Sequence, residues 1–178
     1  MNLRNTLFSA LLFLVLAAYL YFFELNKDPE GKGEKLLRFK EEEVESLILS
    51  YPDQEIRMQK ESSGKWKIMQ PLETAANGST IRTVLSVLSS ADINKTIEKE
   101  PSGDDIKAFG LDKPKVRVSI TLQKGKTLPS LLIGDKTPVG GSMYAKRDDN
   151  PTVYTIEEFS YRQLNKRLAD FLGEEPKK

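Results

Sequence analysis

The stretch Val116-Arg-Val-Ser-Ile-Thr-Leu122 decides the fold. Apolar residues alternate strictly with polar or charged ones along it, which is the pattern of a β-strand with one face buried and the other in water. Lys124-Gly125-Lys126 then turns the chain, and an apolar run returns at 128–133, where Pro129 indicates an edge position or a bulge. Two further strands are expected, at 143–146 and 152–156. The second half of the chain is therefore predicted to be an antiparallel β-meander.

The first half shows the same kind of alternation. Three strands are expected there, at 44–51, 55–60 and 65–70. A hairpin turn at Ser62-Ser63-Gly64 joins the last two, and Pro71 ends the third. Trp66 and Ile68 share one face of the third strand, so Trp66 is expected to pack in the core rather than to stack on a ligand.

A helix is expected after each meander. Asn77 or Ser79 is a good N-cap for the first one, which runs to about Ala91. Apolar residues at i, i+3, i+4 and i+7 line one face of that helix: Ile81, Val84, Leu85 and Leu88. Ser160 is expected to cap the final helix, which ends at Gly173. Its apolar face consists of Tyr161, Leu164, Leu168, Phe171 and Leu172.

A short strand at 95–98 and a brief helix are expected between the meanders. Ser102-x-x-Asp105 resembles a capping box that starts this helix. Gly110 is expected to end it in a left-handed cap, with Leu111 folding back onto it. Pro114 prevents continuation.

Together these patterns predict an α+β fold, in which an N-terminal transmembrane helix is followed by two antiparallel β-meanders, each packed by a helix. The domain is expected to span 41–173, with possible lobes at 41–100 and 101–173. Residues 24–40 mix charge with Gly and Pro and are expected to be a linker. Residues 174–178 are expected to be a polar tail.

The transmembrane prediction rests on Thr6–Phe23, which carries no charge between Arg4 and Glu24. As a helix this run would be about 27 Å long, close to the thickness of a bilayer core of about 30 Å. A cleaved signal peptide is the alternative. The apolar run is longer than the usual signal core of about 7–15 residues, which favours a retained single-pass signal-anchor.

Orientation follows from the geometry of this anchor. The basic residues after residue 23 would keep the domain in the cytoplasm if charge alone decided. The charge rule weakens for long translocated domains, so we expect a cytoplasmic tail at 1–5 and an extracytoplasmic domain attached to the inner or cytoplasmic membrane through residues 6–23.

Composition narrows the classes of function. Lys plus Arg number 27 and Asp plus Glu number 26, a balance that argues against nucleic-acid binding. The chain has no Cys and no His, so it lacks thiolate chemistry and the commonest general base and metal ligand. No glycine-rich nucleotide-binding motif is found. We therefore expect no enzymatic activity, no catalytic residue, no cofactor and no metal.

Several motifs follow one another in a fixed order: Gly64-x-Trp66-x-Ile68-x-x-Pro71, Ala76-Asn77, Phe109-Gly110-Leu111-Asp112-x-Pro114, Leu132-Ile133-Gly134 and Pro138-x-Gly140-x-x-x-Tyr144-Ala145. In this order the chain resembles an uncharacterised bacterial family of membrane-anchored proteins, catalogued as a domain of unknown function. The resemblance implies an N-terminal membrane helix, an extracytoplasmic domain and proximity to ABC-type transport components of the kind linked to gliding motility. It implies no activity. The chain departs from the family in having Asn77, where Asp is more frequent, and in being shorter than many members.

The loop after residue 133 is the most unusual one. We interpret it as a candidate contact for a ligand or partner, because its glycines let another backbone approach closely. The candidate residues are Gly134, Asp135, Pro138, Gly140, Gly141 and Tyr144. A bend between strands is the alternative. Structural roles are expected for Trp66, Pro71, Asn77, Phe109, Gly110, Leu111 and Pro114.

Two local patterns carry less weight. Ser62-x-x-Lys65 has the spacing of a Ser–Lys nucleophile, but it lies in a hairpin turn rather than on a helix. Asp148-Asp149-Asn150 offers oxygens for Ca²⁺ but lacks the spacing and the closing Glu of a calcium loop, so a turn is expected.

The leading hypothesis is a membrane-anchored extracytoplasmic interaction domain that acts by protein contact, as an accessory or scaffold part of a transporter-like envelope complex. The alternative is a module that binds envelope glycan or peptide through residues 134–145. A carboxylate-based hydrolase is the remote third reading.

Overall fold

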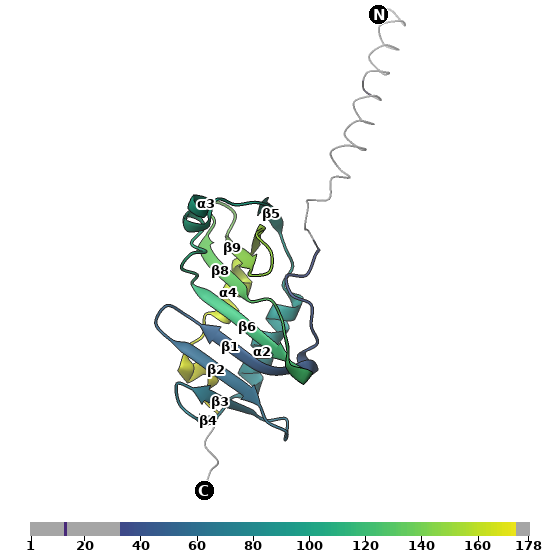
Figure 1. Cartoon of the computed structure of the whole chain (residues 1–178), viewed down its shortest axis with the longest axis vertical. Coiled ribbons are helices and arrows are strands. Elements are labelled where there is room, and N and C mark those ends of the chain that lie inside the picture. Colours follow the sequence, from purple (N-terminus) through teal and green to yellow (C-terminus); the bar gives the residue numbers. More distant parts are fainter. Residues whose placement is uncertain (1–12, 14–32, 174–178) are drawn as a thin grey trace, which may run out of the picture.

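The computed structural model describes Phe13 and residues 33–173, and the domain is built on one antiparallel sheet (Figure 1). The strand order is β4-β3-β2-β1-β6-β8-β9-β10-β5, and β7 pairs with β6 beside this path. The strands are β1 (Val44–Ser50), β2 (Glu55–Lys60), β3 (Trp66–Gln70), β4 (Thr74–Ala75), β5 (Lys95–Glu98), β6 (Val116–Leu122), β7 (Lys126–Thr127), β8 (Leu131–Lys136), β9 (Ser142–Arg147) and β10 (Val153–Glu157).

The predicted α+β arrangement of two meanders, each packed by its own helix, is wrong. β1 pairs with β6 from Ser46↔Thr121 to Ser50↔Arg117, and β5 from the first half pairs with β10 from the second. The possible lobes at 41–100 and 101–173 thus share a single ten-stranded sheet with few helices. The physical reason is that β1 and β6 would otherwise each be an edge with unpaired N–H and C=O groups.

Helix α2 (Gly78–Ser90) covers one face of this sheet together with the C-terminal helices (Figure 1). The four predicted apolar residues of α2 are buried, and the predicted cap is confirmed. The Asn77 side-chain oxygen accepts hydrogen bonds from the backbone N–H groups of Ser79 (3.1 Å) and Thr80 (3.3 Å). The main core lies between α2 and inward residues of the central strands, such as Leu47 and Ile120.

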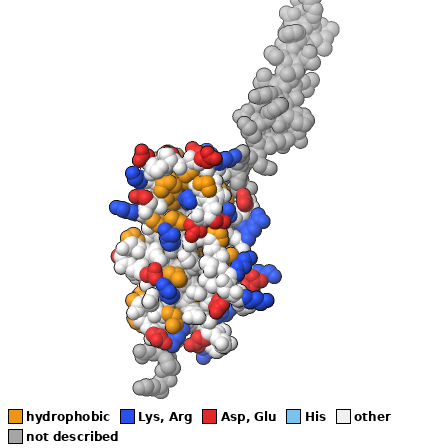
Figure 2. Space-filling view, in the orientation of Figure 1, with side chains coloured by type: hydrophobic (Ala, Val, Ile, Leu, Met, Phe, Trp, Pro, Cys, Tyr) orange, Lys and Arg blue, Asp and Glu red, His pale blue; other side chains and the backbone are white. Residues whose placement is uncertain are grey.

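The opposite face is covered only at one end. Helix α3 (Gly103–Ala108) begins at the predicted Ser102–Asp105 capping box and crosses that face. Leu111, Leu132 and Val153 form a small second core beneath it. Figure 2 shows hydrophobic side chains gathered near α3, whereas the rest of this face is largely polar. The sheet therefore has one fully packed face and one mostly open face.

The C-terminal helix differs from its prediction. Two short helices, α4 (Glu158–Leu164) and α5 (Leu168–Phe171), replace one continuous helix. Ser160 is a buried residue inside α4 rather than its cap. The break is held by Tyr51, whose hydroxyl donates to the carbonyl of Leu164 (2.6 Å) and accepts from the Lys166 backbone N–H (3.3 Å).

The last described residues reach back to the start of α2. Asn77 N–H donates to the Phe171 carbonyl (2.8 Å), and Gly173 N–H donates to the Ala75 carbonyl (3.0 Å). The C-terminal segment therefore lies beside the short edge strand β4 and covers the edge of β4 that is not paired with β3.

Residues 34–37, which fall within the predicted linker, are part of the fold. Leu36 and Leu37 are buried in the main core. Leu36 N–H donates to the Ala91 carbonyl (2.9 Å), and Ile93 N–H donates to the Glu34 carbonyl (2.8 Å). A 3₁₀ turn, η2 (Glu41–Glu43), then leads into β1. The chain is thus fixed to the C-terminal end of α2 before the first strand begins.

No helix in the described residues is long and apolar enough to cross a membrane. The predicted span at 6–23 lies outside those residues, except for Phe13.

Candidate functional site

The predicted contact residue Gly134 is buried against the backbone that follows α3. A Cβ atom at Gly134 would lie 2.2 Å from the carbonyl oxygen of Phe109. The backbone N–H of Asp135 donates to the same carbonyl (2.8 Å), and the Asp135 carboxylate pairs with Lys115 at 2.8 Å. That ion pair raises the pKa of Lys115. Gly134 thus permits a close approach, but the approaching backbone belongs to the same chain.

The Phe109-Gly110-Leu111 segment forms the other half of this contact. Gly110 has a φ of +66° and ends α3 as predicted. Leu111 N–H donates to the Ile106 carbonyl (2.9 Å), and its side chain is 3% exposed in the second core. The rings of Phe109 and Tyr144 lie against each other, with centroids 4.5 Å apart. The structure therefore joins two of the sequence motifs in one packing contact, next to a half-buried Pro114.

The remaining candidates, Pro138, Gly140 and Gly141, form an exposed turn between β8 and β9. Thr137 Oγ1 donates to the Val139 carbonyl (2.8 Å), and both glycines have positive φ angles, +93° and +62°. Four hollows of 500 to 610 Å³ on the described surface are lined by residues other than the six candidates. The predicted loop is thus a projecting turn.

A groove beside Trp66 offers a better site. It measures about 590 Å³ and is bounded by η2, the β2–β3 hairpin, β4 and the first turns of α2. Its lining consists of Glu41, Glu42, Lys60, Glu61, Gly64, Lys65, Trp66, Lys67, Ala75, Ala76, Gly78, Arg82 and Leu85.

Trp66 has a position that local sequence explains. It starts β3 on the same face as the buried Ile68, so the ring packs partly on the main core and partly lines the groove. The Trp66 carbonyl accepts a hydrogen bond from Ala76 N–H (2.9 Å). Gly78 leaves room beside the ring, since a Cβ there would lie 3.9 Å from Trp66 Cδ1. The indole is therefore a fixed wall of the groove.

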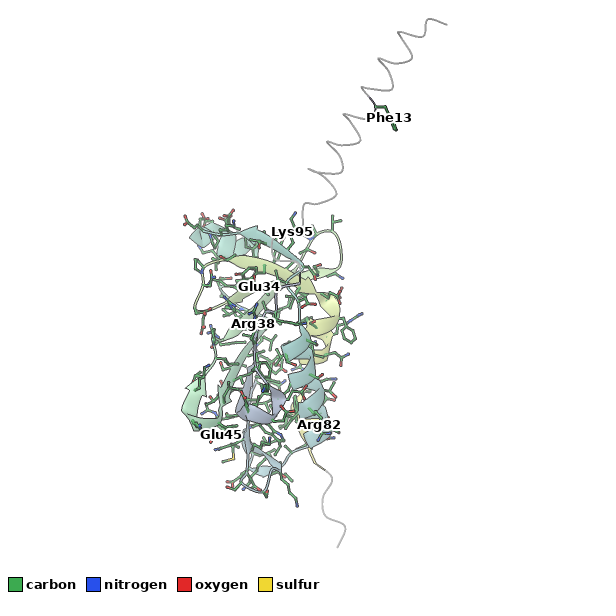
Figure 3. All side chains as sticks on the ribbon, turned by 90° about the vertical axis from the view of Figure 1, so that its right-hand side faces the viewer. Phe13, Glu34, Arg38, Glu45, Arg82 and Lys95 are labelled. Carbon is green, nitrogen blue, oxygen red and sulfur yellow. The ribbon has the colours of Figure 1, made fainter. Side chains whose placement is uncertain are left out.

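Charges of both signs surround this wall. Lys60 Nζ donates to the Glu42 carbonyl (3.4 Å), and Lys67 pairs with Glu73. The hydrogen bond between them raises the pKa of Lys67 and lowers that of Glu73. Lys65 and Arg82 are exposed and have no ion-pair partner within residues 33–173. Figure 3 labels Arg82 at the end of the molecule that lies away from Glu34.

The sequence predicted a core position for Trp66, whose ring packs there only in part, and it did not predict the groove. Its charged residues come from separate segments: Glu41 from η2, Lys60 from β2 and Arg82 from α2. No local motif connects them, and only the folding of α2 against the hairpin brings them together.

Across residues 33–173 no group of three or more acidic side chains lies close enough to hold a metal ion.

The fold and the groove define the class of this protein. It is a small domain with one antiparallel sheet and a surface groove of mixed charge at one end. The chain belongs to the family described as "Domain of unknown function (DUF4340)", whose model matches residues 66–176. The match begins at Trp66, so β1 and β2 lie before it, although they connect β3 to β6 in the sheet. No curated protein and no solved structure matches the chain.

Proposed function

We propose that this protein is a membrane-attached accessory domain that acts by protein contact, and that the groove beside Trp66 is its main contact surface. The observation that carries the proposal is a half-buried tryptophan that lines a groove of about 590 Å³ together with an arginine that makes no ion pair within residues 33–173. Trp and Arg are the residues that most often dominate the binding energy of protein interfaces.

The charge pattern supports a protein partner over a phosphorylated ligand. Glu41, Glu42 and Glu61 face the same groove as the lysines and Arg82. Four basic side chains and three carboxylates line the groove, so a phosphate group would meet repulsion as well as attraction, whereas a protein surface can present charges of both signs in matching positions.

Membrane attachment is supported by the sequence of residues 6–23, whose apolar length suits a bilayer core. We propose that the domain lies outside the cytoplasm, in bacteria, as an accessory or scaffold part of a transporter-like complex. The resemblance of the motifs to membrane-anchored bacterial proteins near ABC-type components supports this assignment.

The test is site-specific photocrosslinking of the full chain in native membranes. A photoreactive residue at Glu42, an exposed residue that lines the groove, should give one discrete heavier adduct, identified by mass spectrometry. The same probe at Arg117, an exposed arginine on the open face of β6, is the matched control and should give none.

Two variants check that the adduct depends on the groove. Trp66→Ala removes the aromatic wall, and Lys65→Glu reverses an exposed charge that makes no described ion pair. Both should reduce the Glu42 adduct at least tenfold, and Lys65→Glu should do so without changing the melting temperature. Recovery of the native protein alone and monomeric from mild detergent, with no adduct, would refute the proposal.

A further inference from the structure

We propose that the end of the domain where the chain enters the fold rests on the membrane surface, with Val139 and Phe159 as its apolar contacts. This inference rests on the membrane attachment proposed above and adds an orientation and a lipid-contacting surface to it.

The first step is where the chain enters. The backbone hydrogen bonds of Glu34 and Leu36 hold it against the C-terminal end of α2, and Lys35 Nζ pairs with the Asp92 carboxylate at 2.8 Å. Because Leu36 and Leu37 are buried, the chain is fixed to the domain at these residues. The end that carries Asp92 and Asn94 is therefore the end nearest to residues 6–23 along the chain.

The second step is reach. Residues 24–32 connect the apolar run to Gly33. At about 3.3–3.6 Å per residue, a segment of this length spans at most about 30 Å. The domain is therefore held close to the bilayer that receives residues 6–23.

The third step concerns the side chains that lie at this end of the domain. Val139 is 86% exposed and Phe159 is 52% exposed, and both are large and apolar. Phe159 lines a hollow of about 500 Å³ together with Gly33 and Asn94. The Glu158 N–H donates to the Gly141 carbonyl (3.3 Å), which brings the turn that carries Val139 next to the start of α4. Phe159 thus lies beside the point of chain entrance, and the turn that carries Val139 lies next to the helix that carries Phe159.

The turn holds Val139 outward in a fixed way. Thr137 Oγ1 donates to the Val139 carbonyl (2.8 Å) and accepts from the Ser142 N–H (3.3 Å), which closes the turn. Exposed apolar side chains next to a membrane-attached segment match the composition of surfaces that dip into the headgroup layer.

Two lysines at this end are held in ion pairs. Lys35 pairs with Asp92, and Lys136 pairs with Glu158 at 2.7 Å. The contact should therefore depend on apolar insertion rather than on anionic lipid, and it should persist at high salt.

The Trp66 groove lies at the other end. Helix α2 runs from Gly78, which lines the groove, to Ser90, next to the chain entrance, and thirteen helical residues extend about 20 Å. In Figure 3, Glu34 and Lys95 lie toward one end and Arg82 toward the other. The proposed contact therefore turns the groove away from the lipid.

The experiment uses the absence of cysteine in the chain, which allows single-cysteine labelling. The full chain carries an environment-sensitive fluorophore at Val139→Cys, Phe159→Cys or, as a control in the hairpin beside the groove, Ser63→Cys. Each protein is reconstituted into phosphatidylcholine vesicles with a nitroxide lipid as quencher. Labels at 139 and 159 should be quenched at least twofold more than the label at 63, with or without phosphatidylglycerol.

Outcomes separate the two proposals. Failure of the full chain to float with vesicles refutes membrane attachment and this inference together. Flotation with equal quenching at 139 and 63 overturns only this inference. A crosslink between two copies of the chain through Val139→Cys, formed by a bifunctional thiol reagent in the vesicles, also overturns it, because a second copy of the chain would then cover the surface.

A second set of variants tests whether the Val139 and Phe159 side chains make the membrane contact. With the label at Lys95→Cys, close to the chain entrance, the double change Val139→Ser and Phe159→Ser should lower the quenching to that of the label at 63. Quenching that stays unchanged would overturn the role of these two residues.

Discussion

The carbonyl oxygen of Phe109 lies 2.2 Å from the place that a Cβ atom would take on Gly134. Real Cβ atoms do not approach an oxygen so closely, so only glycine fits at this position while the two backbones stay in contact. The Asp135 N–H···O=C Phe109 hydrogen bond depends on the same approach. The two motifs are thus complementary halves of one contact between β8 and the segment after α3.

Gly134→Ala should destabilise the domain by about 3 kcal/mol, because a methyl group must push the Phe109 backbone away and break that hydrogen bond. Urea unfolding of the full chain in detergent measures the effect. Gly103→Ala is the control, since a Cβ there meets no atom within 4 Å, and it should change stability by less than about 0.5 kcal/mol. Equal effects of the two changes would contradict the contact.

Leu111→Ala should destabilise by about 2–4 kcal/mol, because the side chain is 3% exposed in the small second core and its removal leaves a cavity. The exposed Leu72 provides the comparison, and Leu72→Ala should cost less than about 0.5 kcal/mol. A surface-like value for Leu111 would remove the second core as a source of stability.

Asn77→Ala should destabilise by about 1 kcal/mol, because the N–H groups of Ser79 and Thr80 lose their acceptor. Asn77→Asp keeps an acceptor oxygen and adds a negative charge at the N-terminus of α2, so it should retain or exceed the original stability. Thermal unfolding of the three proteins checks the order, and a loss in Asn77→Asp as large as in the alanine variant would contradict the cap.

Burial raises the pKa of Tyr51 to about 12 from an ordinary value of 10.0. The folded protein therefore keeps the phenol neutral where the unfolded chain ionises it. The contribution of the buried Tyr51 phenol to the free energy of unfolding is complete below about pH 10. It is lost as the pH rises toward about 12, at about 1.4 kcal/mol per pH unit.

Tyr51→Phe should remove this part of the alkaline loss. It should also cost about 1 kcal/mol at neutral pH, because the hydrogen bond to the Leu164 carbonyl disappears. Urea titrations of both proteins between pH 8 and pH 11.5 measure the difference, in which the titration of lysines cancels. Parallel curves would show that Tyr51 does not ionise on unfolding.

Individual strands and helix ends could be predicted from the sequence because the residues that determine them are close together in the chain. The alternation in Val116–Leu122, the Asn77 cap and the left-handed stop at Gly110 each depend on residues a few positions apart. All three are confirmed. The break between α4 and α5 was missed because its cause, the Tyr51 hydroxyl, lies far away in the chain.

Strand pairing could not be predicted in the same way. Nothing local in Val44–Ser50 indicates that Ile48 pairs with Ser119, because any alternating strand could occupy that edge. Leu36 and Leu37 show no periodicity, and their burial is decided by the end of α2. The candidate loop was chosen for its glycines, yet the glycines serve a turn and an internal contact, while the groove is assembled from distant segments.

The pairing of β1 with β6 and of β5 with β10 also sets the order in which the domain can form during synthesis. Strand β1 leaves the ribosome long before β6, and β4 waits for Gly173 to cover its free edge. Such long-range pairing slows folding and exposes strand edges in the meantime. The first half of the nascent chain therefore keeps unpaired strand edges until the last strand and the C-terminal helices have emerged.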